Sequence, residues 1–545
     1  MIRITLLVVY VLGFCAYAFK DWFKSLCALI LLMAVVEHPD MPKSILGIPG
    51  MNPWNLLFGV VVITWLMARK REQLVWDMPR HVNVLLVLYL GVVLIGWLRL
   101  MLDRDMVSLS GSDLVSEMLI NTLKWVVPGL ILFDAARTRE RFRLAVLCSI
   151  AVYFLLAVQV IRWMPLSAAV SGESLSERSI KILVNEVGFH RVNMSAMLAA
   201  GSWAIFAALP LAQTRLQRVA VIAGFVMTVF GQALTAGRAG YVTWIAVGFI
   251  LCLLRWRKYL LLGPVMVAAV LILAPGVVDR MMEGFRSAPV TFGMEAQRTG
   301  PDVYAVTAGR NVAWPLVIEK IKERPIVGWG RLAMVRTGLT ARLAAFQEGF
   351  SHPHNAYLEM LLDNGLIGFM LVMPFFAVVL WKSVSLFMDS RDPLFYGIGG
   401  ISCAFLLALM VAAMGSQTFY PREGWVGLWC VLGLMLRVHV ERSRALAPQA
   451  VTSTAAVRMT LRRGARSAIA VPAVSQYRPA MPKSARASRT PPPPSDLVSA
   501  PTSASSGPAN AAGTNSTRPL RPGTAPRYHV LAPSQREFGA RRRTR

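Results

Sequence analysis

Long apolar runs recur along most of this chain, and they constrain its fold more than any other feature. Several approach the ~20 residues that an α-helix needs to cross a bilayer. The sequence lacks the period-two alternation that is typical of membrane β-barrels. Examples of the runs are residues 82–102, 194–211, 259–274, 366–381 and 395–414. On the same ~20-residue measure, the pattern predicts an all-α polytopic membrane protein with about 12–13 transmembrane helices.

The short connections between these runs differ in charge, which orients the chain in the membrane. Short loops rich in lysine and arginine mark the cytoplasmic side. An even number of runs separates each basic loop from the next, so one orientation satisfies them all. The basic loops are residues 68–71, 137–143, 215–218, 255–258 and 437–442. The orientation of the N-terminus depends on two early runs, at 6–17 and 26–36, and stays open.

The opposite face, which is the periplasm in a bacterium, receives the remaining connections. These are residues 103–113, 165–193, 235–240 and 275–364. The last of them is far longer than an ordinary loop, and loops of that length are commonly functional. We therefore expect an inner-membrane protein with one long periplasmic loop that contains short helices, and with its functional site on the periplasmic face.

Positive charge accumulates at the C-terminal end of the chain. The formal net charge is +28, and residues 441–545 carry 18 lysines and arginines against 3 acidic residues. This segment has a run of prolines and no apolar periodicity, so it cannot bury a core. Nucleic acid binding is one interpretation of a basic chain, but basic cytoplasmic segments of membrane proteins favour anionic lipids. We predict a transmembrane domain at 1–440, with its periplasmic loop at about 275–364, and a disordered cytoplasmic tail at 441–545 that contacts anionic lipids and no nucleic acid.

A polar cluster, Ser351-His352-Pro353-His354-Asn355, stands shortly before one of the apolar runs. Polar groups at a membrane boundary are costly unless water, protein partners or a ligand satisfy them. Residues 355–363 indicate a short helix that stops at Asn364-Gly365, which places His354 at a helix N-terminus. The helix dipole disfavours imidazolium there, so His354 is expected to be neutral and able to act as a general base. The alternative is a structural histidine bonded to a loop carbonyl, which fits His352 better.

Two arginines on the outer face have positions suited to binding an anion. Arg238 lies in the turn 234–240, where glycines permit close approach and the planar guanidinium offers paired donors to two oxygens. Arg310 follows Gly309 at the start of a helical stretch through Lys322, where an anion is favoured and a lone cation is not. The alternatives are a snorkelling arginine in a tight turn and an exposed arginine, respectively.

Further polar residues could contribute to the same face. His190, Arg191 and Asn193 lie at the outer end of a predicted span, and Lys124 lies within another, where a charge is a functional candidate unless it snorkels to the boundary. The Asp103-x-Asp105 spacing could indicate a metal, but it arises often by chance. No nucleotide-binding glycine pattern or cysteine metal site is present. We therefore predict no metal and no cofactor.

Four motifs in this order resemble those of the O-antigen ligase and O-antigen polymerase superfamily. They are the arginine turn around Arg238, Gly309-Arg310-x-x-x-Trp314, Pro325-x-x-Gly328-x-Gly330, and His354-Asn355 followed after nine residues by Gly365-x-x-Gly368. The resemblance is best over residues 190–369. The sequence departs from the family in having Gly-Arg-Ala where Ser-Arg-Gly is common, and in its long tail.

The resemblance implies an integral-membrane glycosyltransferase that uses saccharides on undecaprenyl diphosphate, without metal or nucleotide. Its acceptors would be lipid A–core, another glycan or a protein. By motif, His354 would activate the acceptor hydroxyl for inverting attack, and Arg238 and Arg310 would bind the diphosphate. Possible substrate contacts are His190, Arg191, Asn193, His352, Asn355 and Lys124.

Three alternatives to a ligase remain open at this point. A polysaccharide polymerase and a protein O-oligosaccharyltransferase would use the same site, because the motifs are shared. A transporter of lipid-linked glycans belongs to a different class, and it would favour paired charges within the spans and internal repeats. Intramembrane charges are few here and the polar motifs gather on one face, so an enzyme is preferred.

Overall fold

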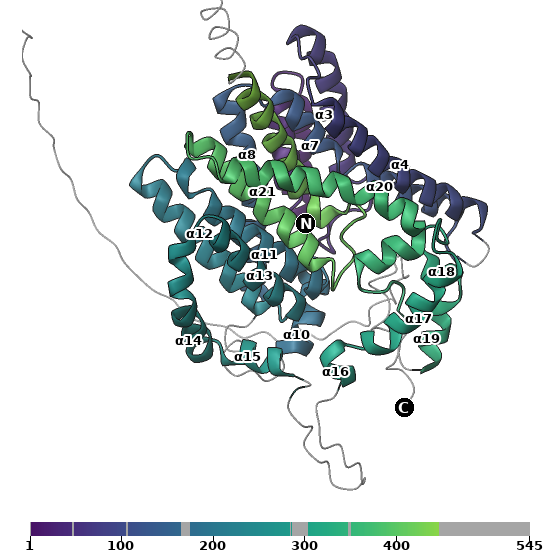
Figure 1. The fold of residues 1–545 in the computed structure, drawn as a ribbon. Helices are drawn as coiled ribbons and strands as arrows, with labels where there is room; N and C mark the ends of the chain where they lie inside the picture. The colour runs from purple at the N-terminus through teal and green to yellow at the C-terminus, as the bar shows by residue number, and fades with distance from the viewer. Residues whose placement is uncertain are drawn as a thin grey trace, which may run out of the picture. The chain divides into compact units, whose positions relative to one another are not determined.

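The computed structural model describes residues 2–45, 48–104, 107–164, 175–283, 285, 303–346 and 350–445 (Figure 1). The predicted tail lies outside the described residues, except for 441–445, which continue the last helix. The described chain is helical apart from its loops and one short antiparallel pair, β1 (Ser44–Ile45) with β2 (Ile48–Pro49), in which Ile45 is opposite Ile48.

The first part of the chain forms α1 (Ile2–Tyr17), α2 (Trp22–Leu32), α3 (Pro53–Arg71), α4 (Arg80–Leu102), α5 (Gly111–Asp113), η1 (Leu114–Ile120), α6 (Asn121–Leu123), α7 (Val127–Ala135), α8 (Arg139–Trp163), α10 (Leu175–Ile182) and η2 (Leu183–Val187). The middle part forms α11 (Arg191–Ala207), η3 (Leu209–Leu211), α12 (Arg215–Leu234), α13 (Arg238–Leu254), η4 (Arg257–Leu262), α14 (Gly263–Leu273), α15 (Pro275–Met282), α16 (Val303–Thr307), α17 (Arg310–Glu323), α18 (Ala333–Arg336) and α19 (Leu339–Phe346). The last part forms α20 (Ala356–Phe387), α21 (Pro393–Ala412) and η5 (Glu423–Trp425), which opens a helix that ends at Ala445.

The apolar runs form helices that can cross a membrane, which confirms the predicted all-α polytopic membrane fold. Among the described residues, eight helices are long and apolar enough to span: Arg80–Leu102, Gly111–Ala135, Arg139–Trp163, Arg191–Leu211, Arg215–Leu234, Ala356–Phe387, Pro393–Ala412 and Glu423–Ala445. Shorter apolar helices are Ile2–Tyr17, Trp22–Leu32 and Arg238–Leu254. The chain is therefore a multi-pass membrane protein, and the count of full-length spans is lower than the 12–13 expected from the runs.

The predicted basic loops coincide with the starts and ends of helices. Thr138 caps α8 by accepting a hydrogen bond from the Arg141 N–H, and Thr214 and Gln217 form a capping box at the start of α12. Each of these caps satisfies N–H groups that the first helical turn leaves without partners. The loop predicted at 275–364 contains the short helices α15 to α19, as expected.

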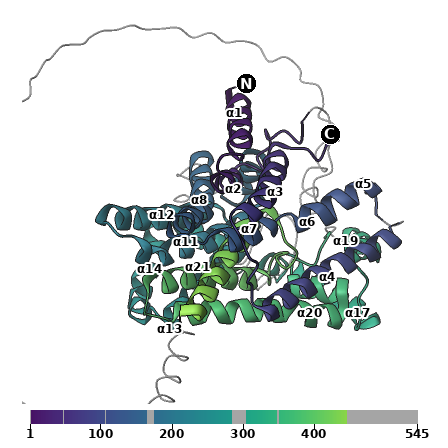
Figure 2. The ribbon, with the colours of Figure 1, turned by 90° about the horizontal axis from the view of Figure 1, so that it is seen from above.

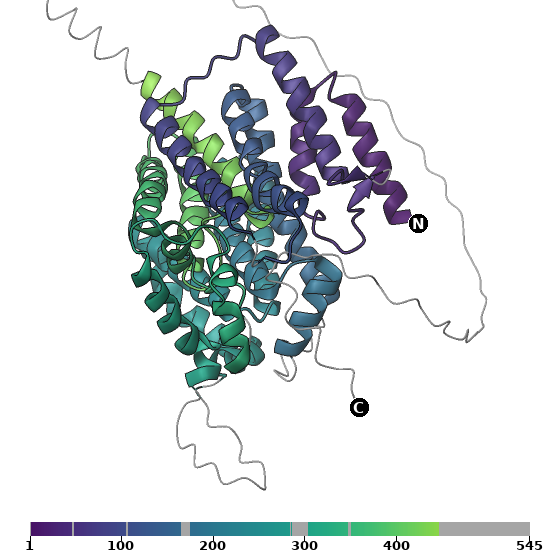
Figure 3. The same cartoon turned by 90° about the vertical axis from the view of Figure 1, so that its right-hand side faces the viewer.

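Helix α11 lies at the centre of the packing, against α8, α12, α13 and α21. Helix α21 also packs along α20, and α20 packs along α4, which runs beside it in Figures 1 and 2. Helices α1, α2 and α3 pack together, with α2 against α8 (Figure 3). This order of neighbours brings α11, α13, α20 and α21 together, and the predicted polar motifs lie at their ends.

Candidate functional site

The starts of three helices meet the end of α21 at one polar region. The Ser195 hydroxyl donates to the Gly237 carbonyl at 3.1 Å, which joins α11 to the turn before α13. The Ala356 N–H donates to the Ala413 carbonyl at 2.7 Å, which joins α20 to α21. A Cβ at Gly240 would lie 1.9 Å from the Ser195 hydroxyl oxygen, so this glycine permits close packing of α13 on α11. The glycines around Arg238 thus position that arginine.

His354 occupies the turn immediately before α20. Its φ of +50° lies in the left-handed region, and Asn355 caps the helix by accepting hydrogen bonds from the N–H groups of Tyr357 and Leu358. Gly365 interrupts α20 with φ 64° and ψ −168°. The short helix that the sequence predicted between Asn355 and Gly365 is therefore present, with His354 at its N-terminus.

The interruption at Gly365 is where the Pro-x-x-Gly-x-Gly segment docks. The segment passes so close to α20 that a Cβ on Gly328 would lie 2.5 Å from the Gly365 nitrogen. Four backbone hydrogen bonds join the two segments: Trp329 N to Leu362 O (2.8 Å), Gly330 N to Asp363 O (2.6 Å), Leu366 N to Pro325 O (2.8 Å) and Ile367 N to Ile326 O (3.1 Å). A break frees backbone groups that must find partners within a membrane protein. The two glycine motifs therefore act as one joint, which fixes the segment after α17 to α20.

Gly328→Ala tests this joint. The new methyl group would overlap backbone atoms, and Gly328 has φ +63°, so we expect destabilisation of about 2–4 kcal/mol. Thermal unfolding of the purified protein in detergent measures the effect. Gly91→Ala on α4 is the matched control, because nothing lies within 4 Å of a Cβ there. Equal unfolding temperatures for the two variants would contradict a contribution of the Gly328–Gly365 packing to stability.

Helix α17 carries Arg310 against the histidine turn. The Trp314 indole N–H donates to the Pro353 carbonyl at 2.9 Å, and an Arg310 guanidinium nitrogen donates to the Gly415 carbonyl at 3.2 Å. The Arg310 Nε is buried and has no hydrogen-bond partner among the described residues. Burial, and then the charge of Arg238, lower the pKa of Arg310. Helix α17 thus contacts the histidine turn through Trp314, and it carries Arg310 with an Nε donor that no described residue accepts.

The two histidines of the turn have their rings in contact, tilted by 49°. Their ring centroids are 4.0 Å apart, and the His354 N–H donates to Nδ1 of His352 at 3.2 Å. Burial first, and then the charges of Arg310 and His190, lower the pKa of His354 to about 3. Burial and His354 also place the pKa of His352 well below its usual range. A neutral imidazole beside a fixed arginine can accept a proton, as a general base must.

The positive charge of the site extends from Arg310 through Arg238 to two further arginines. Arg238 begins α13 and donates to the Glu283 carbonyl at 3.0 Å. Arg280 on α15 donates from Nε to the Ala236 carbonyl at 3.1 Å, and the charges of Arg191 and Arg238 help to lower its pKa. Sequence reasoning missed Arg280. Its signal was a basic residue shortly after an apolar run, in a loop that the sequence predicted to lie on the periplasmic face, where positive residues are under-represented.

The remaining sequence candidates have protein partners of their own. Nδ1 of His190 accepts the Val192 N–H at 3.4 Å at the start of α11, and burial lowers the pKa of His190 to about 4. Asn193 accepts a hydrogen bond from Ser416 at 2.8 Å. Lys124 lies in a different cluster, where it donates to Asn55 at 2.9 Å with its ammonium 4.2 Å from the Trp125 ring centroid.

The Asp-x-Asp pattern has no metal-like setting in the described structure. Asp103 pairs with Arg336, and Asp105 lies outside the described residues. Among the residues that are described, no group of three or more histidine, cysteine, aspartate or glutamate side chains is arranged to hold a metal ion.

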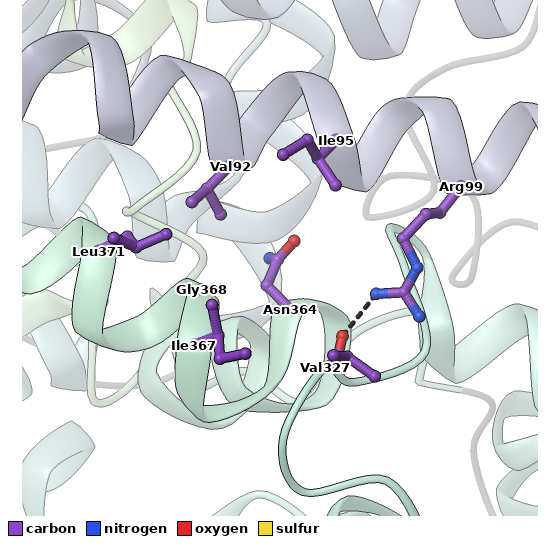
Figure 4. A pocket seen from close by; sticks show the side chains of 8 residues that line it. All are labelled: Val92, Ile95, Arg99, Val327, Asn364, Ile367, Gly368 and Leu371. Carbon is purple, nitrogen blue, oxygen red and sulfur yellow. Dashed lines mark hydrogen bonds between the residues drawn. The ribbon is translucent and has the colours of Figure 1, made fainter.

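A separate cavity of about 350 Å³ lies between α4 and α20 beside the glycine joint (Figure 4). Its lining residues are Val92, Ile95, Arg99, Val327, Asn364, Ile367, Gly368 and Leu371. Arg99 donates to the Val327 carbonyl at 2.5 Å and to the Gly328 carbonyl at 2.7 Å, so it braces the joint. Asn364 is ten residues beyond His354, which is about 15 Å along a helix. The cavity therefore lies beside the joint, and Arg238, Arg310 and His354 do not line it.

Comparison with known families assigns the same region. The family model described as O-Antigen ligase matches residues 223–373. The matched stretch includes Arg238, Arg310 and His354, together with the joint at Gly365. Residues 223–373 thus match the O-antigen ligase family that the motifs predicted. No curated protein matches the chain.

Proposed function

We propose that this protein transfers a glycan from undecaprenyl diphosphate to an acceptor hydroxyl, as an inverting O-antigen ligase-type enzyme. The observation that carries the proposal is the buried His354 in a turn that contacts α17, the helix that begins with Arg310. The charges of Arg310 and Arg238 are close enough to influence this region. A base and an anion site side by side match a reaction in which a hydroxyl attacks and a diphosphate leaves.

The reaction follows from the positions of these groups. A ring nitrogen of His354 takes the proton of the acceptor hydroxyl as its oxygen forms a bond to the anomeric carbon. The bond from that carbon to the diphosphate oxygen breaks, and its electron pair stays on the diphosphate. Because the nucleophile enters opposite the leaving group, the anomeric configuration inverts. The diphosphate is already a good leaving group, so the proposed step needs no metal.

The arginines favour the products of this step over the substrates. A glycan-linked diphosphate gains negative charge when the sugar leaves, because an ester oxygen becomes a free phosphate oxygen. Guanidinium groups form paired, charge-assisted hydrogen bonds to such oxygens. Their burial excludes water, which strengthens the interaction with charge that develops during the reaction. Arg238 and Arg310 thus stabilise the transition state more than the bound donor.

The proposed location is the periplasmic face of a bacterial inner membrane. If each span crosses the membrane once, the basic loops fall on one side. Counting the helices in the same way puts α15 to α19 and His354 on the opposite side. We propose that the donor arrives within the outer leaflet and that the tail at 441–545 stays on the cytoplasmic side, away from the chemistry.

The acceptor class is tested by transfer assays with purified protein and a donor labelled in its glycan. Lipid A–core, a free glycan and a hydroxyl-bearing protein are offered separately. Label on lipid A–core supports a ligase, label in longer glycan a polymerase, and label on protein an oligosaccharyltransferase. Absence of label on all three, with label carried across the membrane still attached to its lipid, would overturn the proposal in favour of a transporter.

The pH dependence of transfer should reflect the low pKa of His354. Because its pKa is lowered to about 3, His354 stays unprotonated as the pH falls. We expect kcat/KM for the donor to change by less than about twofold between pH 7.5 and 5.5, whereas a base with the ordinary pKa of about 6.5 would lose about tenfold. Initial rates at subsaturating donor measure this. A tenfold loss at pH 5.5 would contradict a buried, neutral base.

A further inference from the structure

Arg280 lies where the turn that carries Arg238 meets α15. Arg280 is 9% exposed. Its Nε donates to the carbonyl of Ala236, which has φ +53°. The guanidinium of Arg280 also forms an ion pair with Glu283, one turn further along the chain. The backbone carbonyl of Glu283 accepts the hydrogen bond from Arg238. A single residue, Glu283, therefore supplies acceptors to two arginines of the site.

The electrostatics at Arg280 are unfavourable for an isolated cation. Burial first, and then the charges of Arg191 and Arg238, lower the pKa of Arg280 to about 9. The Glu283 side chain is 51% exposed, so water screens the ion pair and it stabilises little. Arg280 is buried, has like charges near it and is paired with a half-exposed carboxylate. An anion with more charge would stabilise its guanidinium better than Glu283 does.

We propose that Arg280 is a third donor-binding arginine, and that Glu283 occupies it until the diphosphate of the donor displaces the Glu283 carboxylate. This inference rests on the proposed function, because it assigns another ligand to the same diphosphate. A phosphate oxygen pair fits the planar guanidinium as well as a carboxylate does and carries more charge. Glu283 then competes with the donor, so removing its charge should strengthen donor binding.

The experiment measures binding of undecaprenyl diphosphate to full-length protein in nanodiscs, for the wild type, two single variants, their combination and a control variant. Glu283→Gln should bind about two- to fivefold more tightly, since a half-exposed ion pair has to be broken in the wild type. Arg280→Gln should bind about tenfold or more weakly, which is the loss expected for a charge-assisted hydrogen bond. In the double variant, Glu283→Gln should have no further effect.

Glu323→Gln is the matched control. Glu323 pairs with Lys320 on α17 at the same sequence separation, and its side chain is 52% exposed. This variant should bind as the wild type does. Tighter binding cannot arise from a damaged fold, so Glu283→Gln separates ligand competition from a structural role of the ion pair.

Binding by Glu283→Gln equal to or weaker than that of the control would overturn the inference, as would wild-type binding by Arg280→Gln. The proposed function fails separately: it fails if Arg238→Lys and Arg310→Lys bind undecaprenyl diphosphate and transfer glycan as the wild type does. If those two variants are impaired while Glu283→Gln is unchanged, the function stands and Arg280 only positions the turn at Ala236.

Discussion

Replacing His354 with asparagine is expected to reduce the kcat of glycan transfer by about 10²–10⁴-fold, the usual contribution of a general base. Asparagine tolerates the left-handed backbone that His354 adopts (φ +50°), so the turn before α20 should persist. Its amide cannot take the proton of a hydroxyl. Transfer from purified lipid-linked donor, with protein amount in the membrane measured in parallel, gives the result.

His352→Ala serves as the comparison for this prediction. His352 accepts the backbone N–H of His354, so its loss should disturb the turn and reduce transfer by a smaller factor. If His354→Asn turns over at a near-normal rate, His354 is not the base. If His352→Ala is the more damaging of the two, the roles assigned to the two histidines are reversed.

Arg238→Lys and Arg310→Lys are each expected to reduce kcat/KM for the donor by about 10–10²-fold. Lysine keeps the positive charge but loses the planar fork that binds two oxygens together, and each lost charge-assisted hydrogen bond contributes about 1.5–3 kcal/mol. In Arg310→Lys the hydrogen bond to Gly415 is also at risk. Initial rates over a range of donor concentrations measure both kcat and KM.

Arg342→Lys on α19 is the control for these variants, because Arg342 is an exposed arginine in the same segment between α14 and α20. It should transfer at the wild-type rate. If both lysine variants match this control in rate and donor affinity, Arg238 and Arg310 do not bind the diphosphate.

Local patterns in the sequence were sufficient to predict the helical fold and the histidine turn. Apolar runs are continuous along the chain, so the spans can be read directly, and Asn355 and Gly365 are ordinary start and stop signals for a helix. The structure confirms both. The proximity of Arg238, Arg310 and His354 was expected only because their segments share one face of the membrane.

Features that depend on packing between distant segments could not be predicted in this way. The docking of Gly328 on Gly365 joins residues whose pairing has no periodic signal, although each glycine was part of a motif. Arg280 was missed because nothing in its neighbourhood shows that α15 returns to the turn at Ala236. Lys124 illustrates the reverse case: a charge within a span is satisfied by Asn55 on α3, which the sequence does not place beside it.

The count of spans differed for a physical reason as well. Helix α13 (Arg238–Leu254) shows the reason. It is apolar, but it is shorter than the helices that reach the full spanning length. Hydrophobicity alone does not distinguish such a helix from a complete span, because short helices are accommodated by neighbours and by local thinning of the bilayer.

One measurement tests the central claim most directly. Purified full-length protein in proteoliposomes is given a donor labelled in both glycan and lipid, together with the acceptor that supports transfer, and both products are counted. We predict one undecaprenyl diphosphate released for each glycan transferred by the wild type, and release at least about 10²-fold slower by His354→Asn, although that variant still binds the donor. Equal release by His354→Asn, or glycan that crosses the membrane while still attached to its lipid, would contradict the account.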